Sequence, residues 1–366
     1  MPKLCLLANA ASSHTEKWAR ELSRRGWQVS IVSFLPAEIP GVEIYVVPKL
    51  LGGKFDVIFR AGWVVDKLRA LAPDIVHAHY ATSFGFLGTL AGLRPLIISA
   101  WGSDIFAFPR ISPVHAWLLK RILRRADVLC STSRIMAAEM RKYIGQDRPV
   151  EVIPFGVDVG TFRPGGPSAR DSGQPVVFGV AKYLQPVYGL DILLQAFALL
   201  DRKNRGTARL RIAGTGDELV KLQALAAKLG IQDKIDWLGH LPNREVAAFY
   251  RTLDVVVVPS RQESFGVTAV EGSACGRPII ASEVGGLREV VINGETGILL
   301  PPEDPVKLAE TMAYLIDHPA ERQRLGQSGR EFVLQHYDWA ENVSLMEAVY
   351  RRVLESRSEV RGPKSE

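Results

Sequence analysis

The sequence predicts an α/β protein with two doubly wound parallel sheets, and three observations support this fold class. Strand-like apolar runs alternate with helical patterns along nearly the whole chain, as in repeated βαβ units. The run DVVVV at residues 254–258 is typical of a parallel strand that is buried on both faces. The length of 366 residues exceeds what one hydrophobic core usually supports, so we expect two domains.

The composition is that of an ordinary globular protein, with 47% hydrophobic and 23% charged residues. Cys5, Cys130 and Cys275 lack metal-ligand spacing and indicate a reducing compartment without disulfides. No apolar run approaches the roughly 18 residues of a membrane helix, and the N-terminal stretch has no cleavage site. We therefore expect a cytoplasmic protein.

The positive charge is uneven along the chain. Residues 1–155 carry 20 Lys and Arg against 12 Asp and Glu, whereas the remainder carries 25 against 27. No element interleaves these cations with aromatic stacking residues, so we expect no nucleic-acid partner. The positive half predicts anionic acceptors or peripheral contact with the inner face of a membrane.

The alternation of elements divides at a predicted hinge, residues 154–156, and at a Gly-, Pro- and Ser-rich connector, residues 163–175. The predicted strands are 3–9, 28–34, 74–80, 96–104, 127–133, 150–158, 175–182, 209–213, 235–241 and 254–258. The predicted helices include 15–25, 113–125, 135–143, 190–199, 266–274, 305–316, 320–335 and 342–354, followed by a polar tail.

The start of the predicted helix 266–274 is the strongest candidate for a ligand site. It follows the buried strand 254–258, and ligand crevices open at the carboxyl ends of such strands. Free backbone N–H groups near Gly266 and Val267 attract an anion such as a pyrophosphate.

Two carboxylates flank this helix start. Glu263 precedes the helix and Glu271 lies inside it, where its side chain leans back toward the N-terminus. Carboxylates repel phosphate but accept hydrogen bonds from pairs of sugar hydroxyls. The arrangement predicts a sugar-nucleotide site, although the spacing alone is more typical of solvated acids.

The same stretch resembles the signature of the family-4 glycosyltransferases, which are retaining enzymes of the GT-B architecture. The resemblance implies two facing Rossmann-like domains with parallel sheets. Residues 1–155 are then the acceptor-binding domain, joined by a C-terminal helix at about 336–366 that crosses back onto it, and residues 156–335 bind the nucleotide sugar. The matching residues are Pro259, Ser260, Glu263, Phe265, Gly266, Glu271, Gly276, Arg277, Pro278, Gly285, Gly286, Glu289, Gly294, Thr296 and Gly297.

The resemblance implies a role for each donor-site residue. Glu271 binds the ribose, Glu263 acts as a catalytic residue beside the donor sugar, and Lys182 grips the diphosphate. Phe265, Gly266 and Val267 complete the donor site, and His240 with Leu241 contacts the base. The family's second phosphate-binding lysine is missing, because Val187 stands at that position.

Ser13 and His14 follow the first strand, where many family members carry a glycine-rich loop. The Ser-Ser-His sequence resembles a polysaccharide-assembly subgroup, which implies that both residues bind the acceptor. Contact of His14 with a donor phosphate and a simply solvated His14 are the alternatives.

His77 and His79 alternate along the predicted strand 74–80 and therefore point to one face. Nothing with ligand spacing accompanies them, so we expect no metal site. We expect His79 to line the catalytic cleft and His77 to be packed.

Trp101 stands where family members often have a histidine, and Trp-Gly-Ser-Asp resembles a subgroup of bacterial envelope glycosyltransferases. Trp101 is then expected to stack on an acceptor sugar, and Asp104 to orient or deprotonate its hydroxyl. A turn aspartate beside a buried tryptophan is the competing interpretation.

The basic helix 113–125 also has two interpretations, a sheet-covering helix with a solvated face or a membrane-surface helix.

The predicted function is a retaining, metal-independent glycosyltransferase without a cofactor. It moves a hexosyl or N-acetylhexosaminyl group from a nucleoside diphosphate, with UDP the first expectation, to a sugar, lipid-linked or small-molecule acceptor in cell-envelope polysaccharide or glycoconjugate synthesis. The alternatives are a sugar-nucleotide epimerase, a non-catalytic sugar-nucleotide-binding protein and, more remotely, a dehydrogenase.

Overall fold

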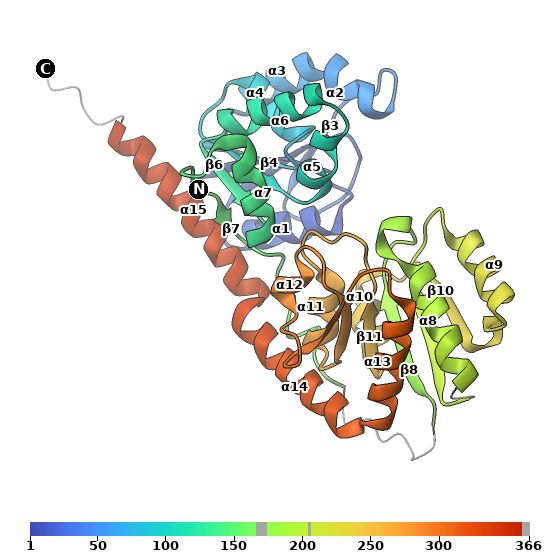
Figure 1. Ribbon diagram of the computed structural model, residues 1–366. Helices are drawn as coiled ribbons and strands as arrows, with labels where there is room; N and C mark the ends of the chain where they lie inside the picture. Colours follow the sequence, from blue (N-terminus) through green and yellow to red (C-terminus); the bar gives the residue numbers. More distant parts are fainter. Residues whose placement is uncertain (166–173, 204–205, 361–366) are drawn as a thin grey trace, which may run out of the picture. The chain divides into compact units, whose positions relative to one another are not determined.

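The computed structural model describes residues 1–165, 174–203 and 206–360 and divides the chain into two compact units (Figure 1). One unit contains residues Met1–Pro154 and Ala340–Glu366, and the other contains Phe155–Trp339. Most of the expected connector, residues 166–173, lies outside the described residues, as do residues 361–366 of the expected tail. Within the described part, no helix is long and apolar enough to cross a membrane.

The N-terminal unit is a seven-stranded parallel sheet in the order β3-β2-β1-β4-β5-β6-β7. The strand order reverses between β1 and β4, so loops at the carboxyl ends of these two strands flank a crevice. The strands are β1 (Lys3–Leu7), β2 (Gln28–Ser33), β3 (Glu43–Val46), β4 (Ile75–His79), β5 (Leu96–Ala100), β6 (Val128–Ser131) and β7 (Glu151–Val152). The helices are α1 (Ser13–Arg24), α2 (Asp56–Phe59), α3 (Ala61–Leu71), α4 (Phe84–Ala91), α5 (Ser103–Phe106), α6 (Pro113–Arg125) and α7 (Arg134–Ile144).

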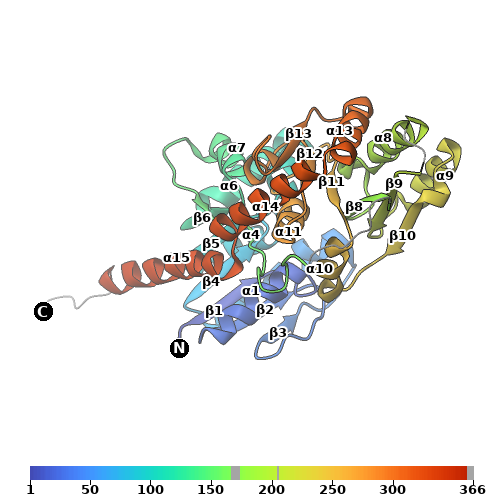
Figure 2. The same ribbon diagram turned by 90° about the horizontal axis from the view of Figure 1, so that it is seen from below.

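The last helix, α15 (Trp339–Val360), packs on the N-terminal unit although it comes from the far end of the chain (Figures 1 and 2). Glu347 accepts hydrogen bonds from Arg25 at 2.7 Å and from the Trp27 indole at 2.9 Å. The fully buried Tyr350 hydroxyl lies 2.7 Å from His77 Nδ1. Through these contacts the C-terminal helix packs back onto the N-terminal domain, as the family resemblance implies.

The C-terminal unit is a six-stranded parallel sheet in the order β10-β9-β8-β11-β12-β13, which reverses between β8 and β11. All four residues of β11 are buried, as the β-branched run predicts. The strands are β8 (Val176–Ala181), β9 (Ala208–Ala213), β10 (Ile235–Gly239), β11 (Val255–Val258), β12 (Ile279–Ser282) and β13 (Gly297–Leu300). The helices are α8 (Leu190–Lys203), α9 (Leu219–Leu229), α10 (Asn243–Arg251), α11 (Val267–Ala274), α12 (Leu287–Val290), α13 (Pro305–Asp317) and α14 (Pro319–His336).

One predicted strand is much shorter than expected. Of residues 150–158, only Glu151–Val152 pair in the sheet. Pro154 has no backbone N–H to donate to a ladder, and the chain passes from one unit to the other directly after it. Val157 instead forms an isolated bridge with Asp338, within the C-terminal unit.

Candidate active site

An open pocket of about 200 Å³ lies in the C-terminal unit beside the carboxyl ends of β8 and β9. Its wall includes Lys182 after β8, Gly214 after β9, His240 and Leu241 after β10, and Glu271 on α11. The pocket therefore brings together four residues that the sequence predicts to bind the donor, namely Lys182, His240, Leu241 and Glu271, from two loops and one helix. Phe265, Gly266 and Val267 do not line it.

The Lys182 ammonium is held by two side chains. Its Nζ donates to Glu263 Oε2 at 2.6 Å and lies 4.3 Å from the centre of the Tyr188 ring. Both members of the ion pair are largely buried, with 13% and 9% of their side chains exposed. The ion pair thus joins the cation that the sequence predicts to bind phosphate to the acid that it predicts to bind the donor sugar.

Tyr188 belongs to the turn Pro186–Tyr188, where the family resemblance places a second cation. The turn sets an aromatic face beside Lys182 in place of that charge, and an aromatic face attracts an ammonium group. Tyr188 is not among the site residues predicted from the sequence. Its place in the KYLQPVYG segment is the feature that could have indicated it.

Arg261 ties the Pro186–Tyr188 turn to the loop that carries Glu263. Its guanidinium donates to both carboxylate oxygens of Asp191 at 2.8 Å and to the Pro186 carbonyl at 2.6 Å. Its backbone N–H donates to the Val187 carbonyl at 2.8 Å. A bidentate arginine pair fixes geometry as well as charge, so Arg261 positions both sides of the Lys182–Glu263 pair.

The glycine pair of the family signature also supports Glu263. The Gly286 N–H donates to the Glu263 carbonyl at 2.9 Å. Gly285 has φ +45°, and a Cβ at this position would clash with the same carbonyl oxygen. Only glycine permits this close approach of the two backbones.

The Gly214-Thr215-Gly216 turn has a similar structural role. A Cβ on Gly214 would clash with the Lys182 carbonyl, and a Cβ on Gly216 would clash with the Leu184 carbonyl. The two glycines let the turn pack against the loop after β8. This packing explains the Gly-x-Gly spacing, so the spacing does not require a bound dinucleotide.

Glu271 is oriented by a buried tyrosine. The Tyr250 hydroxyl donates to Glu271 Oε2 at 3.3 Å. Burial, followed by the charge of Glu271, raises the pKa of Tyr250 well above 10, so the hydroxyl stays protonated and remains a donor. Tyr250 is a second residue that the sequence analysis does not identify.

The start of α11 is only partly open to solvent. Gly266 has φ +111° and is buried, Val267 is half-buried, and no side chain caps the helix. The predicted ligand Phe265 is instead a core residue: it is 2% exposed, and its ring packs against Phe155 and Tyr337. Its ring therefore has a packing role, and its contact with the donor stays a prediction.

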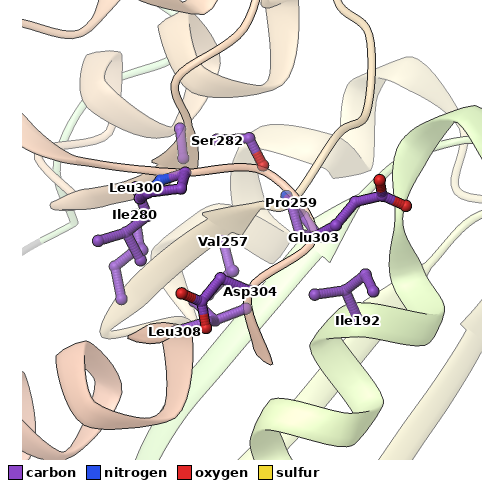
Figure 3. A pocket seen from close by; sticks show the side chains of 11 residues that line it. Ile192, Val257, Pro259, Ile280, Ser282, Leu300, Glu303, Asp304 and Leu308 are labelled. Carbon is purple, nitrogen blue, oxygen red and sulfur yellow. The ribbon is translucent and has the colours of Figure 1, made fainter. Parts of the chain in front are cut away.

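A second hollow at the same edge of the sheet is too small for a sugar nucleotide. It lies beside β11, β12 and β13, and Figure 3 shows Val257, Ile280 and Leu300 among its walls. Its volume of about 10 Å³ holds about one water molecule. The pocket at Lys182 and Glu271 is therefore the candidate donor site.

In the N-terminal unit, three predicted site residues form an aromatic cluster beyond β1, β4 and β5. The Trp101 ring centroid lies 4.7 Å from that of His79 and 5.9 Å from that of His14. Ser13 is the first residue of α1 and is half-buried, next to His14.

Both histidines of β4 are buried and neutral. Burial lowers the pKa of His79 to about 3, with a smaller effect from His14, and burial lowers the pKa of His77 well below 6.5. His77 bonds Tyr350 and Ser99, which fits its predicted packing role. His79 is 3% exposed, and its Nδ1 has no hydrogen-bond partner among the described residues. With its pKa lowered to about 3, the enclosed imidazole is a weak proton acceptor, so it is suited to lining a site and not to general-base catalysis at neutral pH.

Asp104 does not have the environment expected of a residue that deprotonates an acceptor. It is fully buried, and its carboxylate accepts backbone N–H groups of Ala81 and Gly102 at 2.8 Å and of Trp101 at 3.2 Å. It joins the loops after β4 and β5. The competing interpretation of a turn aspartate therefore describes it better, and its role is to position Trp101.

Among the described residues, no group of three or more His, Cys, Asp or Glu side chains is arranged to hold a metal ion.

Solved structures with the same fold cover nearly the whole chain. Sucrose-phosphate synthase from Thermosynechococcus elongatus superposes with a TM-score of 0.84 at 22% identity, over 97% of this chain and 100% of that chain. HepE from Anabaena has a TM-score of 0.81 at 20% identity, over 96% and 100%. At these identities the likeness concerns the fold alone. Two Rossmann-like units with parallel sheets place the protein in the GT-B class, as the sequence predicts.

The family follows from the sequence comparisons. Residues 167–332 match the family described as Glycosyl transferases group 1, and residues 3–133 match Glycosyl transferase 4-like. Relatives named D-inositol 3-phosphate glycosyltransferase are 31% identical in Xylanimonas cellulosilytica, over 93% of this chain and 90% of the relative, and 32% identical in Frankia alni, over 88% and 90%. The chain belongs to the group 1 glycosyltransferases and is a transferase enzyme, which confirms the predicted family.

Proposed function

We propose that the protein is a retaining glycosyltransferase that takes a hexosyl or N-acetylhexosaminyl group from a UDP-sugar without a metal ion. The observation that carries this proposal is the pocket that joins Lys182, His240 and Glu271. HepE, which shares the fold, is described in complex with UDP and glucose. A cation and an acid in the wall of one pocket match the phosphate and the ribose of such a donor.

Each residue has a distinct task in this proposal. Lys182 binds the diphosphate, and Glu271 accepts hydrogen bonds from the ribose hydroxyls. The base lies against His240 and Leu241. Glu263 receives sugar hydroxyls, and its ion pair with Lys182 lets one carboxylate serve both the sugar and the phosphate-binding cation.

The chemistry then requires no protein nucleophile. The bond between the anomeric carbon and the phosphate oxygen breaks, and the bond to the acceptor oxygen forms on the same face. The acceptor proton passes to the departing phosphate oxygen. Lys182 stabilises the charge on the leaving group, which is usually a large part of catalysis. The saturated hydrogen bonding of Asp104 is consistent with a route in which the phosphate is the base.

The acceptor is proposed to bind at the cluster of His14, His79 and Trp101, since aromatic faces stack on sugar rings. The names of the relatives make D-inositol 3-phosphate the first small-molecule acceptor to test. Saccharide acceptors of cell-envelope polysaccharide or glycoconjugate synthesis are the second group of acceptors to test. WaaG, which has a similar fold, is described as a glycosyltransferase involved in lipopolysaccharide biosynthesis. Three buried free cysteines fit our placement of the reaction in the reducing cytoplasm.

The test combines binding and turnover. We expect UDP to raise Tm and a UDP-sugar to raise it further, since stabilisation grows with ligand excess over Kd. With an acceptor, NMR of the product should show the anomeric configuration of the donor, and chelation of metals should leave the rate unchanged. An isomeric sugar nucleotide formed without acceptor would identify an epimerase instead, and stabilisation by NAD alone would identify a dehydrogenase. Donor binding without turnover over a broad acceptor panel would favour a binding protein.

A further inference from the structure

The exposed face of α6 combines apolar and basic side chains in one stripe. Val114 and Trp117 are 69% and 57% exposed, and they lie at the N-terminal half of the helix. The basic residues of the C-terminal half continue along the same face, because positions three or four apart are neighbours on a helix. They are Lys120, Arg121, Arg124 and Arg125, and all four are exposed.

These four cations are not neutralised by the protein. The helix contains no Asp or Glu, and among the described residues none of the four forms an ion pair. The Arg121 guanidinium lies 5.5 Å from the Trp117 ring centroid, so an aromatic group and a cation are presented together. Trp117 and all four basic residues line one open hollow of the surface.

The basic residues of α6 also account for much of the excess positive charge in the N-terminal unit. The sequence of the N-terminal unit has 25 Lys and Arg against 17 Asp and Glu, and α6 supplies half of that excess in 13 residues. The opposite face of the helix covers the sheet through Leu119, Ile122 and Leu123, which are all buried. Sheet covering therefore uses one face and leaves the apolar and basic face without a role in the fold.

We propose that this face of α6 docks the protein on an anionic lipid bilayer. Trp117 and Val114 would enter the interfacial region, where an amphipathic indole ring is favoured, and the four cations would meet anionic headgroups. Exposed apolar side chains distinguish this surface from a general polyanion site, which needs positive charge alone. The proposal is independent of the donor assignment, because no residue of α6 lines the pocket at Lys182 and Glu271.

The test is flotation of the full-length protein with vesicles of phosphatidylcholine containing 30% phosphatidylglycerol, as an order-of-magnitude choice of anionic content. We expect binding at low salt, weaker binding as salt screens the charges, and little binding to pure phosphatidylcholine. Each basic residue near an anionic surface contributes roughly a factor of five in affinity. Lys120→Glu/Arg124→Glu should therefore lower binding roughly 25-fold or more, and Trp117→Ala should lower it without changing the salt dependence.

Two matched variants serve as controls. Arg69→Glu/Lys228→Glu makes the same change in net charge at exposed cations outside α6, and it should retain most of the binding. Leu51→Ser/Phe55→Ser removes exposed apolar side chains elsewhere in the N-terminal unit, and it should also bind. An unchanged Tm shift by UDP shows that each variant is folded.

Three results would overturn the proposal. Wild-type protein that does not float with anionic vesicles has no such surface. Equal losses in the α6 and control charge variants would mean that net charge alone drives binding, and a loss only in Leu51→Ser/Phe55→Ser would place it at another segment. Binding to heparin that matches vesicle binding and is insensitive to Trp117→Ala would assign the face to soluble polyanions.

Discussion

The Lys182 ammonium and the Glu263 carboxylate form a largely buried ion pair with an Nζ to Oε2 distance of 2.6 Å. The two residues come from loops on opposite sides of the point where the strand order reverses, after β8 and β11. This pair is the physical link between the proposed phosphate and sugar subsites. An effect on one residue should therefore be measurable at the other.

Removing one member of the Lys182–Glu263 pair should lower the free energy of unfolding. Lys182→Met leaves a buried carboxylate without its partner, and we expect a loss of about 3 kcal/mol in the free energy of unfolding. The double variant Lys182→Met/Glu263→Gln should recover most of that loss while UDP binding stays weak. Urea unfolding and UDP titration of the two single variants and the double variant measure both effects. Additive losses in stability would show that the two side chains are not coupled.

Glu271→Gln should weaken UDP at least tenfold, because a charge-assisted hydrogen bond to a ribose hydroxyl is worth roughly 1.5–3 kcal/mol. It should leave the fold intact. Calorimetric titration with UDP measures the change. Glu245→Gln on α10 removes an exposed acid outside the pocket and should bind UDP like wild type. Equal affinity in the Glu271 variant would refute the ribose assignment.

Gly285→Ala should disturb Glu263 through the backbone. The added Cβ clashes with the Glu263 carbonyl and the residue has a positive φ, so we expect a loss of more than about 2 kcal/mol and a fall in kcat. Gly294→Ala is the control, since Gly294 also has a positive φ but no atom lies within 4 Å of its Cβ position. It should cost only about 1 kcal/mol. Similar effects of the two substitutions on kcat would show that the Gly285–Gly286 pair does not support the active site.

Arg261→Lys should keep the charge but lose the bidentate contact with Asp191. We expect kcat to fall more than tenfold with a smaller change in the KM for the donor, because the clamp orients Glu263 and does not touch the ligand. Steady-state kinetics with varied UDP-sugar separate the two constants. Arg288→Lys, at an exposed arginine of the same unit, should change neither. A rise in KM alone would mean that Arg261 binds the donor directly.

Acid should destabilise the N-terminal unit through its buried histidines. Burial depresses the pKa of His79 from 6.5 to about 3, so below pH 6.5 the unfolded chain takes up a proton that the folded chain does not. The contribution of His79 to the free energy of unfolding is fully present above pH 6.5 and falls as the pH falls, by about 2 kcal/mol at pH 5. His79→Gln should lose less between pH 7 and pH 5 than wild type in urea unfolding. An identical pH dependence would show that His79 is accessible to protons in the folded state.

Much of the fold could be predicted because its signals are local. The buried strand β11 is visible as four consecutive valines, and α6 begins and ends where its apolar spacing and Pro113 indicate. The environments of Phe265 and Asp104 could not be predicted from the sequence alone. Packing and solvation decide them, and both residues occupy sequence positions where ligand contact and structural support look alike.

By itself the sequence determined the α/β class and the family and predicted the donor-site group of Lys182, Glu263 and Glu271, since periodicity and motif spacing are properties of neighbouring residues. Only the tertiary structure decided which side chains complete the site. The Tyr250 contact with Glu271 and the Arg261 clamp join segments that are separate in the chain, and the Pro186–Tyr188 turn brings the Tyr188 ring back against Lys182. The hydrogen bonds and close contacts that define them exist only after the parallel sheet has brought its loops to one edge.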